Sequence, residues 1–300
     1  MNRVTEIRHV IYGVTGWEAE RAFYSGPWGL REVSASADRV WFAAAGSEEP
    51  CVVGLHRAAV NHLEVIALAA PDRDSIENLH ERVLAANCRV LHAPRTLSGP
   101  FGGYGFRCFS PDGLPLEISC DVARGPQRDV ERWEGIPLGI SHIVLHSPQP
   151  LQAVRFFTEA LGFRISDWLG DFMCFLRCNS AHHRLAILPG PPCLNHVAYD
   201  MRGIDGMMRG IARLHRAGIE VRWGPGRHTA GDNTFSYFVT PGGFTVEYTA
   251  ELERVDFETH QSTVYAPAPQ IMDQWGIGTG GPQSLPHPAP DPCLFQGPQD

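Results

Sequence analysis

One pattern of short motifs occurs twice in this sequence, in the same order and at nearly the same spacing. Each copy contains a histidine in an apolar run, then an Asn-His pair, then a glutamate that follows a turn with Pro and Gly. The first copy has His9, His62 and Glu117 at these positions, and the second copy has His142, His196 and Glu247. Because internal repeats reflect duplicated structural units, we expect two tandem copies, near residues 5–125 and 137–252.

Apolar periodicity places helices and strands in the same order in both copies. Helices are predicted near 17–25 and 74–86 in the first copy, and near 150–161 and 203–217 in the second. Short apolar runs separated by Gly, Asp and Pro predict the strands of the first copy at 8–14, 29–35, 39–45, 51–56, 62–69, 89–93, 104–109 and 114–120. The repeated unit is therefore a βαβββ module, present four times, and the fold class is α+β.

A single module of four or five strands cannot bury its own core. We expect each pair of modules to curl into a partly closed antiparallel barrel around a cavity. This predicts an N-terminal domain over residues 1–130 and a second domain over 131–255. The remaining tail, 256–300, is rich in Pro, Gly and Gln and has no periodicity. We expect this tail to be disordered or laid extended over the body, without a chemical role and with His287 solvated.

Composition and charge exclude several classes of protein. The net charge is −8 and no basic run occurs, so we expect no binding to nucleic acid or to an anionic membrane. The first residues lack the apolar segment of a signal peptide, and the longest apolar stretch, Val65 to Ala70, is too short for a membrane span. None of the eight cysteines forms a C-x-x-C pair, which favours reduced, mostly buried thiols. These features predict a cytoplasmic protein.

The repeated histidines and glutamate of the second copy have the composition of a metal site. Two neutral imidazoles and one carboxylate on a single face form a ligand set that suits Fe(II), and Mn(II) accepts it as well. This set leaves coordination positions free for a substrate and for dioxygen. A lone histidine in a strand is more often a packed core residue, but the joint repetition of all three favours metal. We therefore predict that His142, His196 and Glu247 bind a metal ion.

Side chains able to transfer protons accompany the triad only in the second copy. There the sequence has His182, His183, His228 and Tyr237. Counted back from the glutamate by the same intervals, the first copy has Ser98 and Arg107 in place of the last two. Chemistry that needs a proton donor or acceptor therefore belongs to the second copy. We interpret His9, His62 and Glu117 as a vestigial site without metal.

Several of these residues also have a purely structural interpretation. Successive residues of a strand point to opposite faces, so only one of His182 and His183 can face the cavity. Tyr237 could equally be a core aromatic residue. His146 follows His142 on the same face of its strand and is more often a residue of the cavity wall.

The sequence resembles the type I extradiol catechol dioxygenases of the vicinal oxygen chelate superfamily. The resemblance covers both copies, near residues 5–255, and rests on Cys178-Asn-Ser-Ala-His-His-Arg-Leu-Ala-Ile, Gly226-Arg-His-Thr and Phe244-Thr-Val-Glu-Tyr. It implies iron ligands at His142, His196 and Glu247. It further implies a dioxygen-pocket histidine at His183, an acid–base histidine at His228 and a tyrosine for a substrate hydroxyl at Tyr237.

Two further residues are candidates for contact with the substrate, although this chain departs from the family at one of the positions concerned. Biphenyl-diol enzymes have an asparagine two residues after the position of His228, where this chain has Ala230. Asn233 lies slightly later and is our candidate for that contact, together with Phe175.

The implied reaction is extradiol cleavage of a substituted catechol, with both atoms of dioxygen incorporated, in the catabolism of aromatic compounds. The implied cofactor is Fe(II), with Mn(II) as an alternative, and the family favours a homo-oligomer. Two other functions remain open: a metal-dependent isomerase or epimerase related to the glyoxalases, and a non-catalytic small-molecule binding protein of the same fold.

The ring substituents of the substrate are less constrained by the sequence. Arg184 and Arg227 lie near the site in sequence and leave a carboxylated catechol open. A bulky or bicyclic catechol is favoured if large apolar side chains line the cavity, although each of these is more often a core residue. They are Trp168, Phe172, Met173, Phe175, Met207 and Met208.

Overall fold

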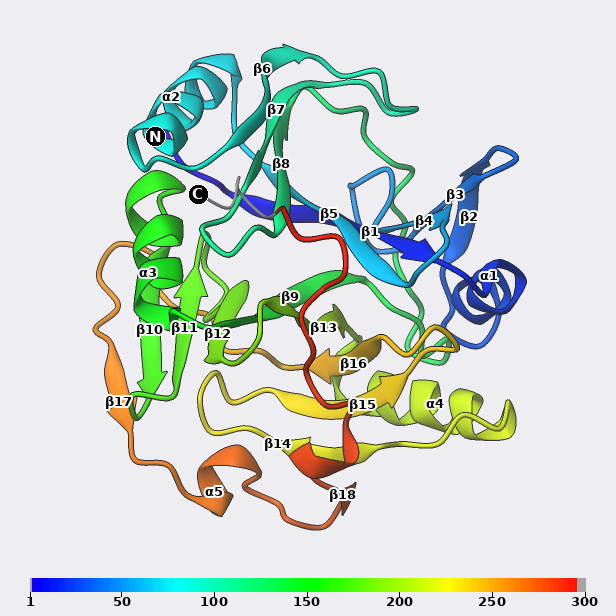
Figure 1. Cartoon of the computed structure of the whole chain (residues 1–300). Helices are drawn as coiled ribbons and strands as arrows, with labels where there is room; N and C mark the ends of the chain where they lie inside the picture. The colour runs from blue at the N-terminus through cyan, green and yellow to red at the C-terminus, as the bar shows by residue number, and fades with distance from the viewer. Residues whose placement is uncertain (1, 296–300) are drawn as a thin grey trace.

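Two β-sheets, one from each copy, form the body of the molecule (Figure 1). The computed structural model describes residues 2–295. The first sheet contains β1 (Glu6–Val14), β2 (Arg31–Ala35), β3 (Arg39–Ala43), β4 (Val53–Arg57), β5 (His62–Ala69), β6 (Val90–Thr96), β7 (Tyr104–Phe109) and β8 (Pro115–Cys120). These strands lie in the order β2-β3-β4-β1-β5-β8-β7-β6.

The second sheet repeats this arrangement and is extended by the tail. It contains β9 (Gly139–Ser147), β10 (Arg164–Leu169), β11 (Met173–Arg177), β12 (Leu185–Pro189), β13 (Cys193–Asp200), β14 (Trp223–Arg227), β15 (Thr234–Val239), β16 (Thr245–Ala250), β17 (Thr263–Tyr265) and β18 (Thr279–Gly280). The order is β17-β10-β11-β12-β9-β13-β16-β15-β14-β18. The predicted α+β fold of two duplicated sheets is thus confirmed.

Both sheets are mixed, which corrects the antiparallel barrels expected from the sequence. The first and last strands of each module pair in parallel: β1 with β4, β5 with β8, β9 with β12 and β13 with β16. Antiparallel pairs of first strands, β1 with β5 and β9 with β13, then join the two modules of a copy. A parallel pair needs a crossover connection, and the helix after each first strand belongs to that crossover.

The helices begin and end close to the predicted residues. They are α1 (Trp17–Ser25), α2 (Arg73–Ala85), α3 (Pro150–Arg155) and α4 (Gly203–Arg216), and α3 continues as a π-helical turn at Phe156–Ala160. The carboxylate of Asp72 accepts a hydrogen bond from the backbone N–H of Ser75 at 2.8 Å, so α2 has an N-terminal cap. Its buried face, which includes Ile76 and Leu79, packs on the first sheet.

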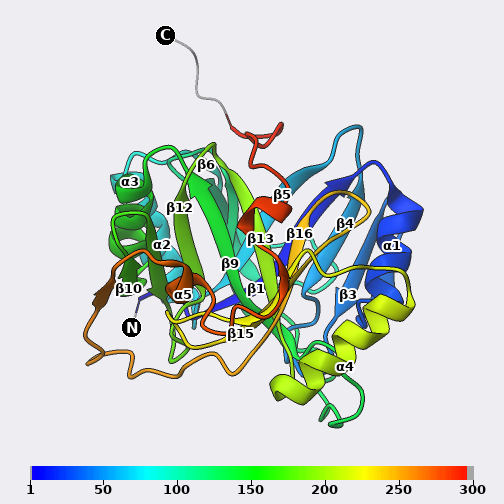
Figure 2. The ribbon, with the colours of Figure 1, turned by 90° about the horizontal axis from the view of Figure 1, so that it is seen from below.

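The two copies share one hydrophobic core rather than packing as separate bodies. Trp28, which follows α1, is fully buried and stacks on Tyr248 of β16 with 4.1 Å between ring centroids. The Tyr248 hydroxyl donates a hydrogen bond to the backbone carbonyl of Trp28 at 2.6 Å. Arg213 of α4 donates to the carbonyl of Pro27 at 2.8 Å, and Figure 2 shows α1 and α4 side by side.

The tail follows the second sheet and is ordered over its described part. β17 pairs in parallel with β10, and β18 pairs antiparallel with β14, so the tail reaches both edges of the sheet. Between these strands lies α5 (Pro269–Met272), and a short 3-10 turn follows at Pro282–Ser284. Of the two arrangements expected for the tail, the extended path over the body is the one found; residues 296–300 lie outside the described part.

The cysteines are free and mostly buried, as the sequence predicts. All eight cysteines are free thiols and six of them are buried. Within residues 2–295, no helix is both long and apolar enough to cross a membrane.

Replacing Trp28 with Ala is expected to lower the free energy of unfolding by roughly 3–5 kcal/mol, because a fully buried indole between the two sheets leaves a large cavity. Urea unfolding followed by circular dichroism measures this. Trp133 is 65% exposed and provides the matched control, for which Ala should change stability by less than about 0.5 kcal/mol. A loss below about 1 kcal/mol for Trp28→Ala would contradict a core shared by the two copies.

Candidate metal centre and active-site pocket

Three potential ligands converge on the concave face of the second sheet. His142 lies on β9, His196 on β13 and Glu247 on β16, and these three strands are direct neighbours. One potential ligand atom from each residue lies within 4.8 Å of the others, and all three side chains are buried. The Nε2 atom of His196 is 3.0 Å and that of His142 is 3.4 Å from Oε2 of Glu247. The three residues that the repeat pointed to, His142, His196 and Glu247, are therefore neighbours in space.

The hydrogen bonding of this group fits a metal ion. Both carboxylate oxygens of Glu247 and Nε2 of His196 are buried without a hydrogen-bond partner among the described residues. Burial raises the pKa of Glu247, but His142 and His196 outweigh it and hold that pKa well below its usual range. An ionised carboxylate buried without partners is costly. A divalent cation offers the missing partner, and two imidazoles with one carboxylate suit Fe(II) or Mn(II).

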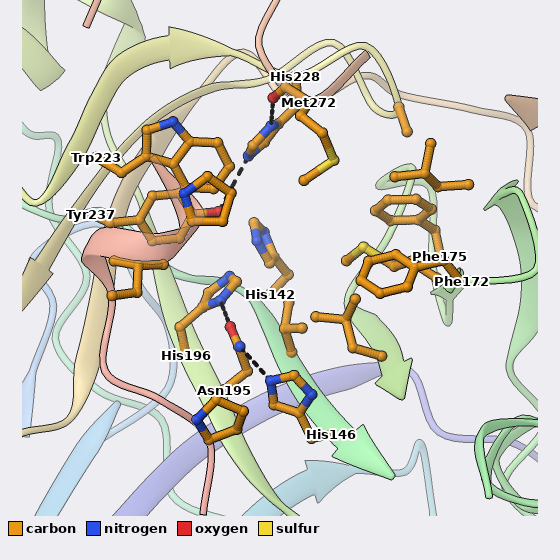
Figure 3. A pocket seen from close by; sticks show the side chains of 18 of the residues that line it. His142, His146, Phe172, Phe175, Asn195, His196, Trp223, His228, Tyr237 and Met272 are labelled. Carbon is orange, nitrogen blue, oxygen red and sulfur yellow. Dashed lines mark hydrogen bonds between the residues drawn. The ribbon is translucent and has the colours of Figure 1, made fainter. Parts of the chain in front are cut away.

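A chain of hydrogen bonds fixes the ring of His196. Its Nδ1–H donates to Oδ1 of Asn195 at 2.5 Å, and the Asn195 amide donates to Nε2 of His146 at 2.8 Å. His146 in turn donates from Nδ1 to the backbone carbonyl of Pro189 at 3.0 Å. Each donor in this chain of hydrogen bonds meets an acceptor. Because the proton of His196 is on Nδ1, its Nε2 keeps a lone pair, and this atom lies 3.0 Å from Oε2 of Glu247. Figure 3 shows this chain at one side of the pocket.

His142 and His196 line a largely apolar cavity of about 240 Å³, and Glu247 lies next to both of them. The expected side chains His183, His228, Tyr237 and Phe175 line it as well. Figure 3 shows the last three around the cavity with His142 and His196. The remaining wall is mostly apolar and includes Val144, Leu169, Phe172, Met173, Leu188, Trp223, Ala230, Ile271, Met272 and Leu285. Among the described residues that line it, none is an arginine or a lysine.

His228 and Tyr237 form a hydrogen-bonded pair in this wall. His228 donates from Nδ1 to the backbone carbonyl of Met272 at 2.6 Å, so its Nε2 accepts from the Tyr237 hydroxyl at 3.2 Å. Burial lowers the pKa of His228 and raises the pKa of Tyr237 well above its usual range. Trp223 stacks on Tyr237 and Phe235 stacks on His228, with ring centroids 5.0 and 4.0 Å apart. The pair is thus neutral and held between aromatic rings.

The histidine doublet divides between two environments, as expected. His183 lines the cavity, with its ring centroid 4.4 Å from that of His142, whereas His182 is fully buried behind it. The doublet lies in the connection between β11 and β12 and not within a strand. Its division therefore comes from the loop conformation and not from strand alternation.

Some candidate substrate contacts do not line the cavity. Asn233 is fully buried, and its amide donates to the hydroxyl of Thr249 at 2.9 Å instead of lining the cavity. Arg184 forms an ion pair with Glu6, and Arg227 pairs with Asp232 and Glu251. Neither arginine lines the cavity. The described apolar candidates that do not line it are Trp168, Met207 and Met208.

The corresponding residues of the first copy do not assemble in the same way. Arg107 lies opposite Glu117 on β7 and β8, in the register that Tyr237 and Glu247 have in the second copy. Its Nε donates to Glu117 at 2.8 Å, so a guanidinium already neutralises that carboxylate. Within residues 2–295, His9, His62 and Glu117 are not brought together as potential ligands.

The tail contributes residues to the cavity, which sequence analysis missed. Ile271 and Met272 of α5 and Leu285 line it, and His287, although exposed, lies at its rim. The expectation of a tail without a chemical role is therefore wrong, because the tail supplies the carbonyl that orients His228. Periodicity could not reveal this, since the contact joins distant segments. The role of Asn195 had a signal, because the Asn-His pair occurs in both copies.

Replacing Asn195 with Leu is expected to weaken Mn(II) binding about 10- to 100-fold, because His196 loses the partner that fixes its ring. Isothermal titration of the metal-free protein with Mn(II) measures the change. The counterpart Asn61 is the matched control, since its side chain bonds the backbone of Thr15 and Gly242 outside the cavity. Asn61→Leu should leave the affinity unchanged, and an equal loss in both variants would contradict the assignment.

Several known proteins are similar to this chain in sequence and fold. Residues 139–248 match the Glyoxalase/Bleomycin resistance protein/Dioxygenase superfamily. The crystal structure of the Mn(II)-bound glyoxalase from Novosphingobium aromaticivorans is similar with 64% identity and a TM-score of 0.97, over 99% of this chain and 98% of that one. Biphenyl-2,3-diol 1,2-dioxygenase of Paraburkholderia xenovorans is 25% identical over 84% of this chain and 90% of its own. Metapyrocatechase 2 of Cupriavidus necator is 27% identical over 66% and 67%. The chain belongs to the Glyoxalase/Bleomycin resistance protein/Dioxygenase superfamily.

Proposed function

We propose that this protein is an extradiol dioxygenase that cleaves an uncharged, substituted catechol with dioxygen. The observation that carries the proposal is that His142 and His196, which adjoin Glu247, line one apolar cavity together with His183 and the His228–Tyr237 pair. Residues 131–255 would form the catalytic domain, and the tail would complete its cavity. A cytoplasmic homo-oligomer, expected from the sequence, is part of the same proposal.

His142, His196 and Glu247 would hold the metal, for which Fe(II) is the first choice and Mn(II) the second. When bound, this ion supplies Lewis acidity that lowers the pKa of catechol hydroxyls and a centre at which catechol and dioxygen meet. Asn195 keeps His196 in the orientation that this requires. The apolar wall excludes water from the cavity, which strengthens every polar contact made inside it.

The neighbouring side chains would bind and move protons. The Tyr237 hydroxyl donates a hydrogen bond to Nε2 of His228. When substrate is bound, the same hydroxyl could donate to a substrate oxygen instead. His228 is neutral because burial lowers its pKa, so its Nε2 can accept a proton from a substrate hydroxyl and return it later. The Met272 carbonyl keeps the proton of His228 on Nδ1 throughout. His183 lines the same cavity, with its ring against that of His142.

Relatives support two reaction classes. The biphenyl-2,3-diol 1,2-dioxygenase and metapyrocatechase relatives support ring cleavage, and they extend over most of this chain. The protein from Novosphingobium, 64% identical, is named a glyoxalase and supports an isomerase as the second candidate. The two classes differ in their need for dioxygen. The His183, His228 and Tyr237 set favours ring cleavage, because it matches the set that the resemblance to extradiol dioxygenases implies.

Oxygen consumption by the metal-loaded enzyme separates these candidates. With 3-methylcatechol or 2,3-dihydroxybiphenyl, we expect uptake of one dioxygen per substrate together with a yellow ring-fission product. Glu247→Ala should abolish metal binding and uptake. Glu117→Gln, the matched change in the first copy, should keep both, with one metal per chain. Metal binding without oxygen uptake would point to the isomerase, and absence of metal binding would refute the site.

The cavity wall predicts discrimination against charged catechols. We expect kcat/KM for 3,4-dihydroxyphenylacetate to be about 100-fold below that for its methyl ester, because a carboxylate would be buried without a cation. The ester has the same ring and side-chain length, so it controls for size. Oxygen-uptake kinetics give both values. Equal values for acid and ester would contradict an uncharged substrate.

A further inference from the structure

A second cluster of polar side chains lies directly behind the cavity and is not part of the proposed metal site. Asp167 of β10 accepts a hydrogen bond from Nε2 of His182 at 2.8 Å. The backbone N–H of Thr263, in the tail, donates to the other carboxylate oxygen of Asp167 at 2.7 Å. His182 and Asp167 are almost fully buried, whereas the nearby His260 is partly exposed and 3.7 Å from Asp167.

This cluster touches the cavity through one contact between the two adjacent histidines. Nδ1 of His182 lies 3.0 Å from Nδ1 of His183. Two imidazole nitrogens at this distance share a single proton, so one of them donates and the other accepts. Which nitrogen carries the proton depends on the partners at the far ends of the two rings.

Asp167 determines which of the two Nδ1 atoms carries the shared proton. An ionised carboxylate only accepts, so Nε2 of His182 carries a proton. A neutral imidazole has one N–H, which leaves a lone pair on Nδ1 of His182. His183 must then donate from its own Nδ1, and its Nε2, for which no hydrogen-bond partner is found among the described residues, presents a lone pair to the cavity.

We propose that Asp167 and His182 are positioning residues that hold the His183 ring with its Nε2 lone pair toward the substrate cavity. The geometry gives His183 the polarity of a hydrogen-bond acceptor, suited to a catechol hydroxyl. The resemblance had implied a histidine that stabilises dioxygen, which requires a donor. The catalytic consequence rests on the proposed function, whereas the orientation and tautomer of the ring do not.

The tail takes part in this arrangement. Because the Thr263 N–H fixes one oxygen of Asp167, only the other oxygen is available to His182. An asparagine at position 167 would keep its carbonyl on the Thr263 N–H and turn its amide NH₂ toward His182. That amide donates, so His182 would carry its proton on Nδ1 instead. His183 would then accept at Nδ1 and present an N–H to the cavity, which reverses its polarity.

The decisive measurement is the tautomer of His183 in wild-type protein and in Asp167→Asn. Long-range ¹H–¹⁵N spectra of the full-length, ¹⁵N-histidine-labelled chain loaded with Zn(II) report which ring nitrogen is protonated, and His183→Gln assigns the peaks. We expect the proton on Nδ1 in wild type and on Nε2 in Asp167→Asn. An unchanged tautomer in the variant, or a proton on Nε2 in wild type, would overturn the proposal.

Kinetics then test the consequence for catalysis. In Asp167→Asn we expect kcat for ring cleavage to fall roughly 100-fold, with the KM for catechol and the metal content changed little. A wild-type enzyme without ring cleavage would refute the proposed function and leave the spectroscopic test valid. A reversed tautomer with unchanged kcat would refute the catalytic role of the lone pair.

A second variant covers the case in which Asp167→Asn does not fold. His182→Phe alone keeps Asp167 with its Thr263 bond and a ring of similar size at position 182, but removes the partner of His183. We expect His183 then to populate both tautomers. A single tautomer identical to wild type would show that His182 does not position the ring, and would also overturn the proposal.

Discussion

The buried carboxylate of Glu247 constrains the second half of this molecule more than any other group. It lies on the central part of a sheet, between two imidazoles, with neither oxygen hydrogen-bonded to a described residue. Such a group is tolerated only beside compensating positive charge. The surrounding residues supply no arginine or lysine, so a divalent cation is the compensation that the site demands. The lone pair of His196, held in place by Asn195, would bind the same cation. The apolar cavity wall would strengthen that interaction.

In the first copy, a protein side chain neutralises the corresponding buried glutamate, Glu117. Arg107 and Tyr237 hold the same register position opposite a buried glutamate, yet Arg107 donates directly to Glu117. A guanidinium that is covalently attached neutralises the carboxylate and needs no ligands from His9 or His62. Arg107 in the place of Tyr237 is therefore one difference between the two sites, beside the separation of His9, His62 and Glu117 in the described residues. The two copies nevertheless share one core, which includes Trp28.

Most of the fold and the central triad could be predicted from the sequence because both depend on local periodicity and on the repeat. The start of α2 follows from its cap at Asp72, and His142, His196 and Glu247 lie on the strands that correspond to those of His9, His62 and Glu117 in the first copy. Asn233 and the arginines were misplaced because their partners, such as Thr249 for Asn233 and Glu6 for Arg184, are chosen by packing between distant segments. Sequence spacing carries no information about which of several nearby polar side chains turns inward.

The tail shows why proximity in space matters more here than order in the chain. The Met272 carbonyl determines which nitrogen of His228 carries a proton, and the Thr263 N–H determines which oxygen of Asp167 meets His182. Both contacts use backbone atoms, which every residue has, so the tail's composition gave no signal of them. A segment without periodicity thus orients His228 directly and holds the carboxylate that His182 contacts. Side-chain identity supplies the reactive groups, and backbone placement decides whether each one donates or accepts.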